Sequence, residues 1–84
     1  MGYYANPTEM ASSRKLNEGT YEELKAQLQD GELLGGLYKR PMFMNAILLY
    51  SKREFDEFES QLPLGLKRIG FFAVPASMFP DYVP

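Results

Sequence analysis

The stretch from Asn45 to Pro75 constrains the fold more than any other part of this chain. The apolar run 46–50 is followed by Ser51 and, three residues later, by Glu54. This is the spacing of a capping box, in which each of the two side chains accepts a hydrogen bond from the other residue's backbone N–H. A helix therefore begins after Ser51, and the apolar run before it is a separate strand, predicted over 44–50.

An alternative joins residues 42–62 into one long helix, with Pro41 at its first position. Several apolar residues would then line up roughly along one side. We favour a strand followed by a helix, because a capping box marks the start of a helix and not its interior. The residues that would line up in the alternative are Met44, Leu48, Phe55, Phe58 and Leu62.

Two further elements complete this stretch. A helix is predicted over Lys52–Leu62, because apolar residues recur there at helical spacing and Pro63 follows. A strand is predicted over Leu66–Val74, and its apolar residues on both faces are typical of a central or covered strand. The residues expected to share one face of this strand are Ile69, Phe71 and Ala73.

Thr20 and Glu23 form a second capping box upstream. It predicts a helix over 21–30, which Gly31 ends because glycine adopts a left-handed conformation at low cost. Glu32–Arg40 is predicted as a strand that pairs antiparallel with the next one. Within it, Gly35-Gly36 marks a bulge or a close approach of the backbone.

These elements predict an α+β fold with the order α-β-β-α-β. We expect a small two-layer sandwich, with a three-stranded mixed sheet and both helices on one face. The predicted organisation is a flexible N-terminal arm over 1–19, a single domain over 20–75 and an extended, proline-spaced C-terminal tail over 76–84.

The composition argues against catalysis. The chain of 84 residues has no histidine and no cysteine, which removes the commonest general base and the thiolate ligands and nucleophiles. We expect a non-enzyme without a cofactor or a bound metal. The carboxylates Glu54, Asp56, Glu57 and Glu59 are expected on the solvent side of their helix. No apolar run reaches the roughly 18 residues that span a bilayer, so a cytoplasmic protein is expected.

The termini favour binding to a protein. Aromatic residues and methionine between prolines form a semi-rigid segment that suits a groove, and a small sheet has edges that can pair with another strand. We therefore expect a partner protein, or a second copy in a homodimer, bound through a sheet edge and the terminal arms. The candidate protein-binding residues are Met78, Phe79, Tyr82, Val83, Tyr3 and Tyr4.

Nucleic-acid binding is the alternative function. Eight of the nine basic residues occur as adjacent pairs, although the net charge of the chain is −2. Two such pairs near one edge of the sheet would bind the phosphate backbone, and an aromatic side chain would stack on a base. The pairs are Arg14-Lys15, Lys39-Arg40, Lys52-Arg53 and Lys67-Arg68. The candidate nucleic-acid-binding residues are Lys39, Arg40, Lys67, Arg68 and Tyr38.

Overall fold

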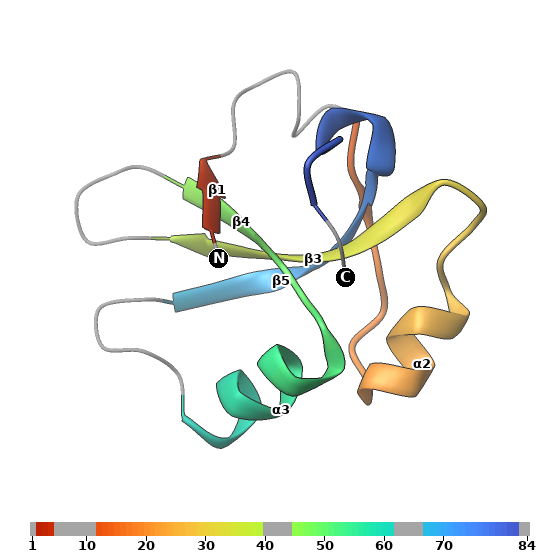
Figure 1. The fold of residues 1–84 in the computed structure, drawn as a ribbon. Helices are drawn as coiled ribbons and strands as arrows, with labels where there is room; N and C mark the ends of the chain where they lie inside the picture. Colours follow the sequence, from red (N-terminus) through yellow and green to blue (C-terminus); the bar gives the residue numbers. More distant parts are fainter. Residues whose placement is uncertain (1, 5–11, 40–44, 62–66, 83–84) are drawn as a thin grey trace.

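One antiparallel sheet organises the chain, and β3 lies at its centre (Figure 1). The computed structural model describes residues 2–4, 12–39, 45–61 and 67–82. The strand order is β1-β4-β3-β5-β2, and every neighbouring pair is antiparallel. The strands are β1 (Gly2–Tyr4), β2 (Arg14–Lys15), β3 (Glu32–Lys39), β4 (Asn45–Leu49) and β5 (Lys67–Pro75).

The α+β class, the three predicted strands and the antiparallel pairing of the first two are confirmed. The prediction of a three-stranded mixed sheet is wrong. β3 lies between β4 and β5 and pairs antiparallel with both. β4 and β5 therefore run in the same direction, but they are not hydrogen-bonded to each other. The strand over Asn45–Leu49 also excludes the single helix over 42–62.

Two short strands extend the sheet on either side. β1 pairs with β4, with Tyr3 opposite Ile47, and β2 pairs with β5, with Lys15 opposite Phe72. Both strands lie in the stretch predicted as an arm, of which residues 1 and 5–11 lie outside the described part. With three and two residues, they are too short to show the alternation by which a strand is predicted.

Both capping boxes form as predicted. In α2 (Tyr21–Ala26), the Thr20 hydroxyl accepts from the Glu23 backbone N–H at 3.2 Å, and the Glu23 carboxylate accepts from that of Thr20 at 2.9 Å. In α3 (Lys52–Ser60), the corresponding Ser51 and Glu54 distances are 3.3 and 3.2 Å. α2 ends earlier than predicted, and the left-handed Gly31, with φ of 79°, lies in the turn before β3.

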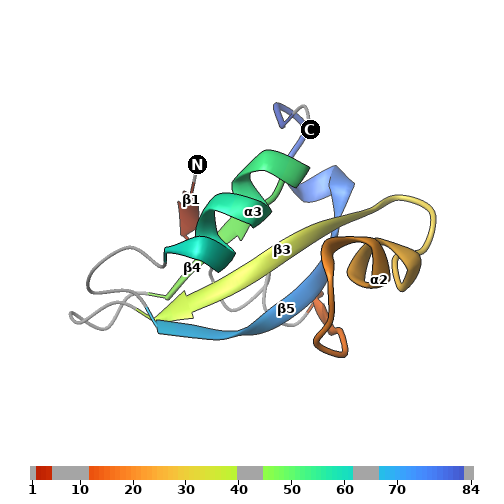
Figure 2. The same ribbon diagram turned by 90° about the horizontal axis from the view of Figure 1, so that it is seen from below.

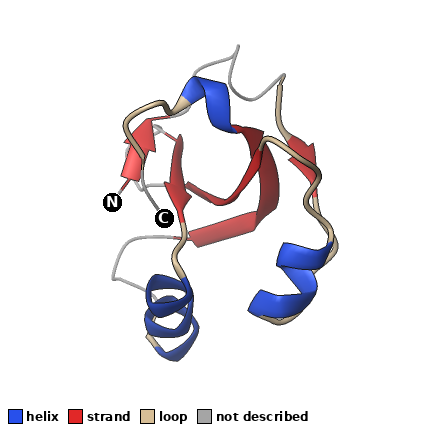
Figure 3. Cartoon of the chain, turned by 45° about the vertical axis from the view of Figure 1, so that its right-hand side comes forward, coloured by secondary structure: helices blue, strands red, loops and turns tan. Residues whose placement is uncertain are grey.

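The sheet buries apolar side chains on both faces. α2 and α3 lie on one face, as predicted, and the 3-10 helix η1 (Ala76–Met78) lies across the sheet from them (Figures 1, 2 and 3). The core of the helix face consists of Leu16, Leu24, Leu34, Tyr38, Tyr50, Phe55, Phe71 and Ala73. The core of the opposite face, which we call the tail face, consists of Leu37, Ile47, Leu49, Val74 and Phe79.

The glycine pair in β3 allows the close backbone approach that the sequence predicted. Both residues are buried. A methyl group on Gly36 would lie 2.8 and 2.9 Å from two carbon atoms of the Tyr50 ring, and one on Gly35 would lie 3.0 Å from Ile47. Only a residue without a side chain lets Tyr50 pack directly on the central strand.

Candidate functional site

The C-terminal aromatic residues pack against the chain's own sheet. Phe79 is buried in the tail-face core, and Met78 and Tyr82 are partly buried against it. Backbone hydrogen bonds hold the segment in place: Ala76 N donates to Gly31 O, in the turn before β3, at 2.8 Å, and Tyr82 N donates to Phe79 O, within the segment, at 3.1 Å. Three of the predicted protein-binding residues therefore contribute to the fold itself.

The other predicted protein-binding residues are divided between the sheet and the part that is not described. Tyr3 and Tyr4 belong to β1 and pair with Ile47 and Ala46 through the backbone. Val83 lies outside the described residues. The backbone of β1 is thus placed at one edge of the sheet, next to β4.

Four of the eight paired basic residues make ion pairs within the described part of the chain. A cation whose charge is matched by a neighbouring carboxylate contributes little to the attraction of an external phosphate. The sequence spacing alone does not show this pairing, because several of the partners are distant along the chain. The pairs are Arg14 with Glu32 at 2.6 Å, Lys52 with Glu22 and Asp56 at 3.4 and 3.1 Å, Arg53 with Glu57 at 3.2 Å, and Arg68 with Glu59 and Glu18 at 2.5 and 3.7 Å.

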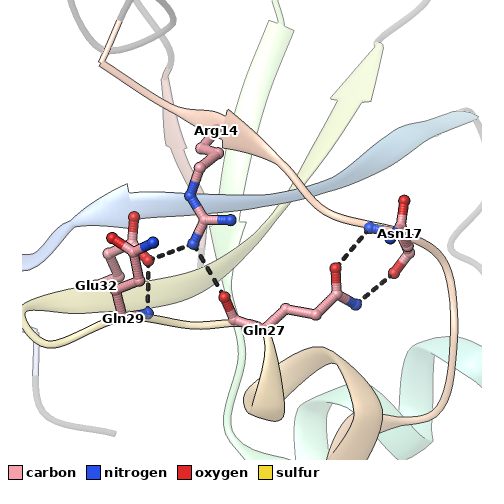
Figure 4. Close-up of polar contacts among 5 residues, drawn as sticks. All are labelled: Arg14, Asn17, Gln27, Gln29 and Glu32. Carbon is pink, nitrogen blue, oxygen red and sulfur yellow. Dashed lines mark hydrogen bonds and ion pairs between the residues drawn. The ribbon is translucent and has the colours of Figure 1, made fainter.

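A polar network around Arg14 attaches β2 to the end of α2 and the start of β3 (Figure 4). The Arg14 guanidinium donates to the Gln27 carbonyl at 3.0 Å and to the Glu32 carboxylate at 2.6 Å. The Gln27 side chain makes two hydrogen bonds of 2.8 Å with the backbone of Asn17. The Arg14 hydrogen bond and a second one from the Gln29 backbone N–H lower the pKa of Glu32. This network explains Arg14 structurally, without a ligand.

The predicted stacking residue, Tyr38, is completely buried. Its hydroxyl shares a short hydrogen bond with the Tyr50 hydroxyl, and burial raises the pKa of both groups. Tyr38 therefore has no ring face open to a base, which contradicts that part of the prediction. Phe71, the other aromatic residue of this region, is also buried, and the Arg68 guanidinium lies 4.5 Å from the centre of its ring.

Two surface hollows lie on the helix side. A hollow of about 380 Å³ adjoins Arg68, and ion pairs to Glu18 and Glu59 already occupy that guanidinium. A hollow of about 570 Å³ lies between α2 and α3 and is crossed by the Lys52–Glu22 ion pair. Within the described ranges, no cluster of three or more carboxylates could hold a metal ion.

The outer edge of β5, on the side away from β3, is only partly covered by another strand. β2 covers only one end of it: Arg14 and Lys15 lie opposite Ala73 and Phe72, and Leu16 N donates to Phe71 O at 2.9 Å. Beyond that point, none of the residues that the structure describes pairs with Lys67–Gly70 on the side away from β3. We call this segment, Lys67–Gly70, the β5 edge.

Ile69 marks the β5 edge. Leu37 lies opposite Gly70 and Tyr38 lies opposite Arg68, so Ile69 is an extra residue in a β-bulge. Its side chain is 46% exposed, and it is the one large apolar residue classed as exposed in the described part of the chain. The bulge breaks the alternation that assigned Ile69 to the same face as Phe71 and Ala73, and that prediction is wrong. No sequence signal distinguishes a bulge from regular alternation at this position.

Three lysines surround the β5 edge. Lys67 belongs to it, Lys39 lies directly opposite Lys67 in β3, and the Lys15 side chain approaches within 3.5 Å of where a methyl group on Gly70 would lie. Lys39 and Lys67 are thus brought together as the sequence predicted, whereas Arg40 lies outside the described residues. The structure shows no ion pair between any of these lysines and another described residue.

The fold defines the chain as a small α+β domain. Comparisons with models of protein families, with curated protein sequences and with solved structures found no match. No helix in the described part is both long and apolar enough to cross a membrane. Function must therefore be argued from the surface of the domain.

Proposed function

We propose that this chain is a non-catalytic interaction module that binds an extended protein segment, from another protein or from a second copy, at the β5 edge. The observation that carries the proposal is the exposed Ile69 at a strand edge that β2 leaves uncovered. A strand edge carries N–H and C=O groups that can form hydrogen bonds with an added strand, and an adjacent apolar side chain supplies contact area.

The proposal moves the binding site away from the terminal arms. Phe79, Met78 and Tyr82 pack on the tail face of the sheet, where Phe79 is buried and the other two are partly buried. The proposal keeps the sheet edge that the sequence analysis named as a binding surface.

The proposed function is tested by comparing the proteins that bind to the parent chain with those that bind to a variant of the β5 edge. The full chain and an Ile69→Asp variant are immobilised in parallel and exposed to extract, and the retained proteins are identified by mass spectrometry. Light scattering over a range of concentrations reports self-association. We expect at least one protein, or the chain itself, to bind the parent and not the variant. A monomeric parent that retains the same proteins as the variant would refute the proposal.

Polyanion binding is a second candidate, and one observation favours it. Lys39 and Lys67 lie directly opposite each other with Lys15 nearby, an arrangement of like charges that disfavours folding and therefore suggests a binding role. Binding of single-stranded nucleic acid at low salt should then weaken steeply as salt rises. The absence of binding at low salt would eliminate this candidate.

A further inference from the structure

The geometry points to one kind of partner for the β5 edge: an extended, acidic segment of a different protein, which adds a strand beside Lys67–Gly70. This inference rests on the proposed function and names the partner's chemistry. It also excludes a second copy of this chain as the partner at this edge.

The backbone of the β5 edge can accept a short strand. β2 pairs with Phe72 and Ala73, and the last backbone hydrogen bond from that side reaches Phe71. Four residues of β5 continue beyond it, which at about 3.3 Å per residue give an edge of about 13 Å. No described residue after Leu16 pairs with this edge through the backbone; the Glu18 side chain forms an ion pair with Arg68 at 3.7 Å, and α2 begins at Tyr21.

The side chains define the chemistry of the partner. Ile69 offers an apolar contact at the middle of the edge. Lys67 is exposed at one end, and Lys15 lies over Gly70 at the other. Lys39, opposite Lys67, adds a third positive charge. A partner strand with an apolar residue between two carboxylates would complement this pattern, because opposite charges across a strand pair are favourable.

Arg68 does not take part in this pattern. Its guanidinium lies over the Phe71 ring and is bound by Glu59 and Glu18 on the helix side. Arg68 therefore belongs to the fold, and among the described residues the cations available to a partner at this edge are Lys15, Lys39 and Lys67. Lys67 and Arg68, although adjacent in sequence, therefore have different roles: Lys67 faces the partner, and Arg68 stabilises the fold.

The same charges argue against a second copy. If two β5 edges paired antiparallel with all four residues overlapping, Lys67 of one copy would lie opposite Gly70 of the other, where Lys15 is located. A parallel arrangement would place Lys67 beside Lys67. Both arrangements bring lysines together, and like charges across a strand pair are unfavourable. An acidic partner removes this repulsion and replaces it with attraction.

The test uses a synthetic peptide in which aspartate alternates with valine and isoleucine, and a matched peptide with lysine in place of aspartate. Binding to the full-length, isotope-labelled chain is followed by nuclear magnetic resonance. We expect the acidic peptide to shift the amide signals of Lys67–Gly70 and to slow their hydrogen exchange, and the basic peptide to leave them unchanged. Lys67→Glu should weaken binding at least about tenfold, and so should an increase in salt.

Lys25→Glu is the matched control, because Lys25 is an exposed lysine on α2 and the substitution makes the same change in net charge. It should leave the affinity for the acidic peptide within about twofold. Equal binding of the two peptides, no binding of either at millimolar concentration, or shifts confined to β1 would each overturn the inference. A dimer that Ile69→Asp dissociates would also overturn it.

The two proposals can fail separately. If the peptides do not bind but the Ile69→Asp variant still loses a retained protein, the β5 edge binds protein and only the inferred chemistry is wrong. If the variant retains everything that the parent retains, the proposed function itself is wrong.

Discussion

Replacing Gly36 by alanine should destabilise the fold severely, because the new methyl group would overlap the Tyr50 ring. It would lie 2.8 Å from Cε2 and 2.9 Å from Cζ, closer than real Cβ atoms approach other atoms. The ring has no room to move, since the rings of Phe55, Phe58 and Phe71 surround it at centroid distances of 5.8–5.9 Å. The Tyr50 hydroxyl is also bound to that of Tyr38.

Two costs add up in this variant. Overpacking in a well-packed core costs about 1–3 kcal/mol, and disturbing the buried hydroxyl pair costs about 1–3 kcal/mol more. Alanine also lowers the conformational entropy of the unfolded chain, which stabilises the folded state and offsets about 0.4–1 kcal/mol of these costs. A loss of about 3 kcal/mol is expected, which lowers Tm by about 12–24 °C in a domain of this size. Only Gly31 is recorded with positive φ among the described glycines, so backbone strain does not enter this estimate for Gly36.

Thermal and urea denaturation of three variants test the estimate. Gly70→Ala is the matched control in a neighbouring strand, because its methyl group would meet Lys15 and Phe72 at an ordinary contact distance of 3.5 Å. It should change the free energy of unfolding by less than about 1 kcal/mol. Adding Tyr50→Phe to Gly36→Ala should restore only part of the loss, because the ring carbons still overlap the methyl group. A Gly36→Ala protein as stable as Gly70→Ala would refute the packing of Tyr50 on β3.

Four further predictions follow from individual contacts. Phe79→Ala should cost about 3–5 kcal/mol in urea denaturation, because this side chain is buried in the tail-face core; an unchanged midpoint would show that the tail does not pack there. Ser51→Ala should cost about 1 kcal/mol and lower the helical circular dichroism, through loss of the α3 cap. Because the pKa of Glu32 is lowered, its carboxylate stabilises the fold when the pH is above the ordinary pKa of 4.5, and this contribution is lost as the pH falls below that value. The free energy of unfolding of Arg14→Ala should therefore decline less steeply at acid pH than that of the parent. The raised pKa values of Tyr38 and Tyr50 stabilise the fold below the ordinary pKa of 10.0, and this contribution is lost as the pH rises above it. Ultraviolet absorbance should show that the phenol groups of Tyr38 and Tyr50 are still protonated when the pH has passed 10.0.

The sequence predicted the elements that local chemistry determines. Ser51 with Glu54, and Thr20 with Glu23, locate both helix starts because a capping box involves residues only three apart. The buried glycine pair in β3 was also predicted as a close approach of the backbone. These features need no knowledge of distant contacts.

The order of strands could not be predicted in the same way. Whether β5 pairs with β3 or with β4 depends on side chains that are distant in sequence, and alternation alone is compatible with both. The bulge at Ile69 has the same origin, since it is defined only by the register between β5 and β3. The candidate site was therefore predicted in part: Lys67 and Lys39 were expected near each other, but Ile69 was assigned to the strand face of Phe71 and Ala73.

The fold also explains why the candidate site lies at an edge and not at the termini. A sheet that is apolar on both faces needs a cover on each, and α2 and α3 cover only one. The second cover has to come from elsewhere in the chain, and Phe79 with its neighbours provides it. Aromatic residues in a proline-spaced tail thus indicate a groove-binding segment, and here the chain's own sheet is the surface that they bind. With both faces occupied in this way, the exposed Ile69 at the β5 edge is the place where we propose that an added strand would gain hydrogen bonds and side-chain contact together.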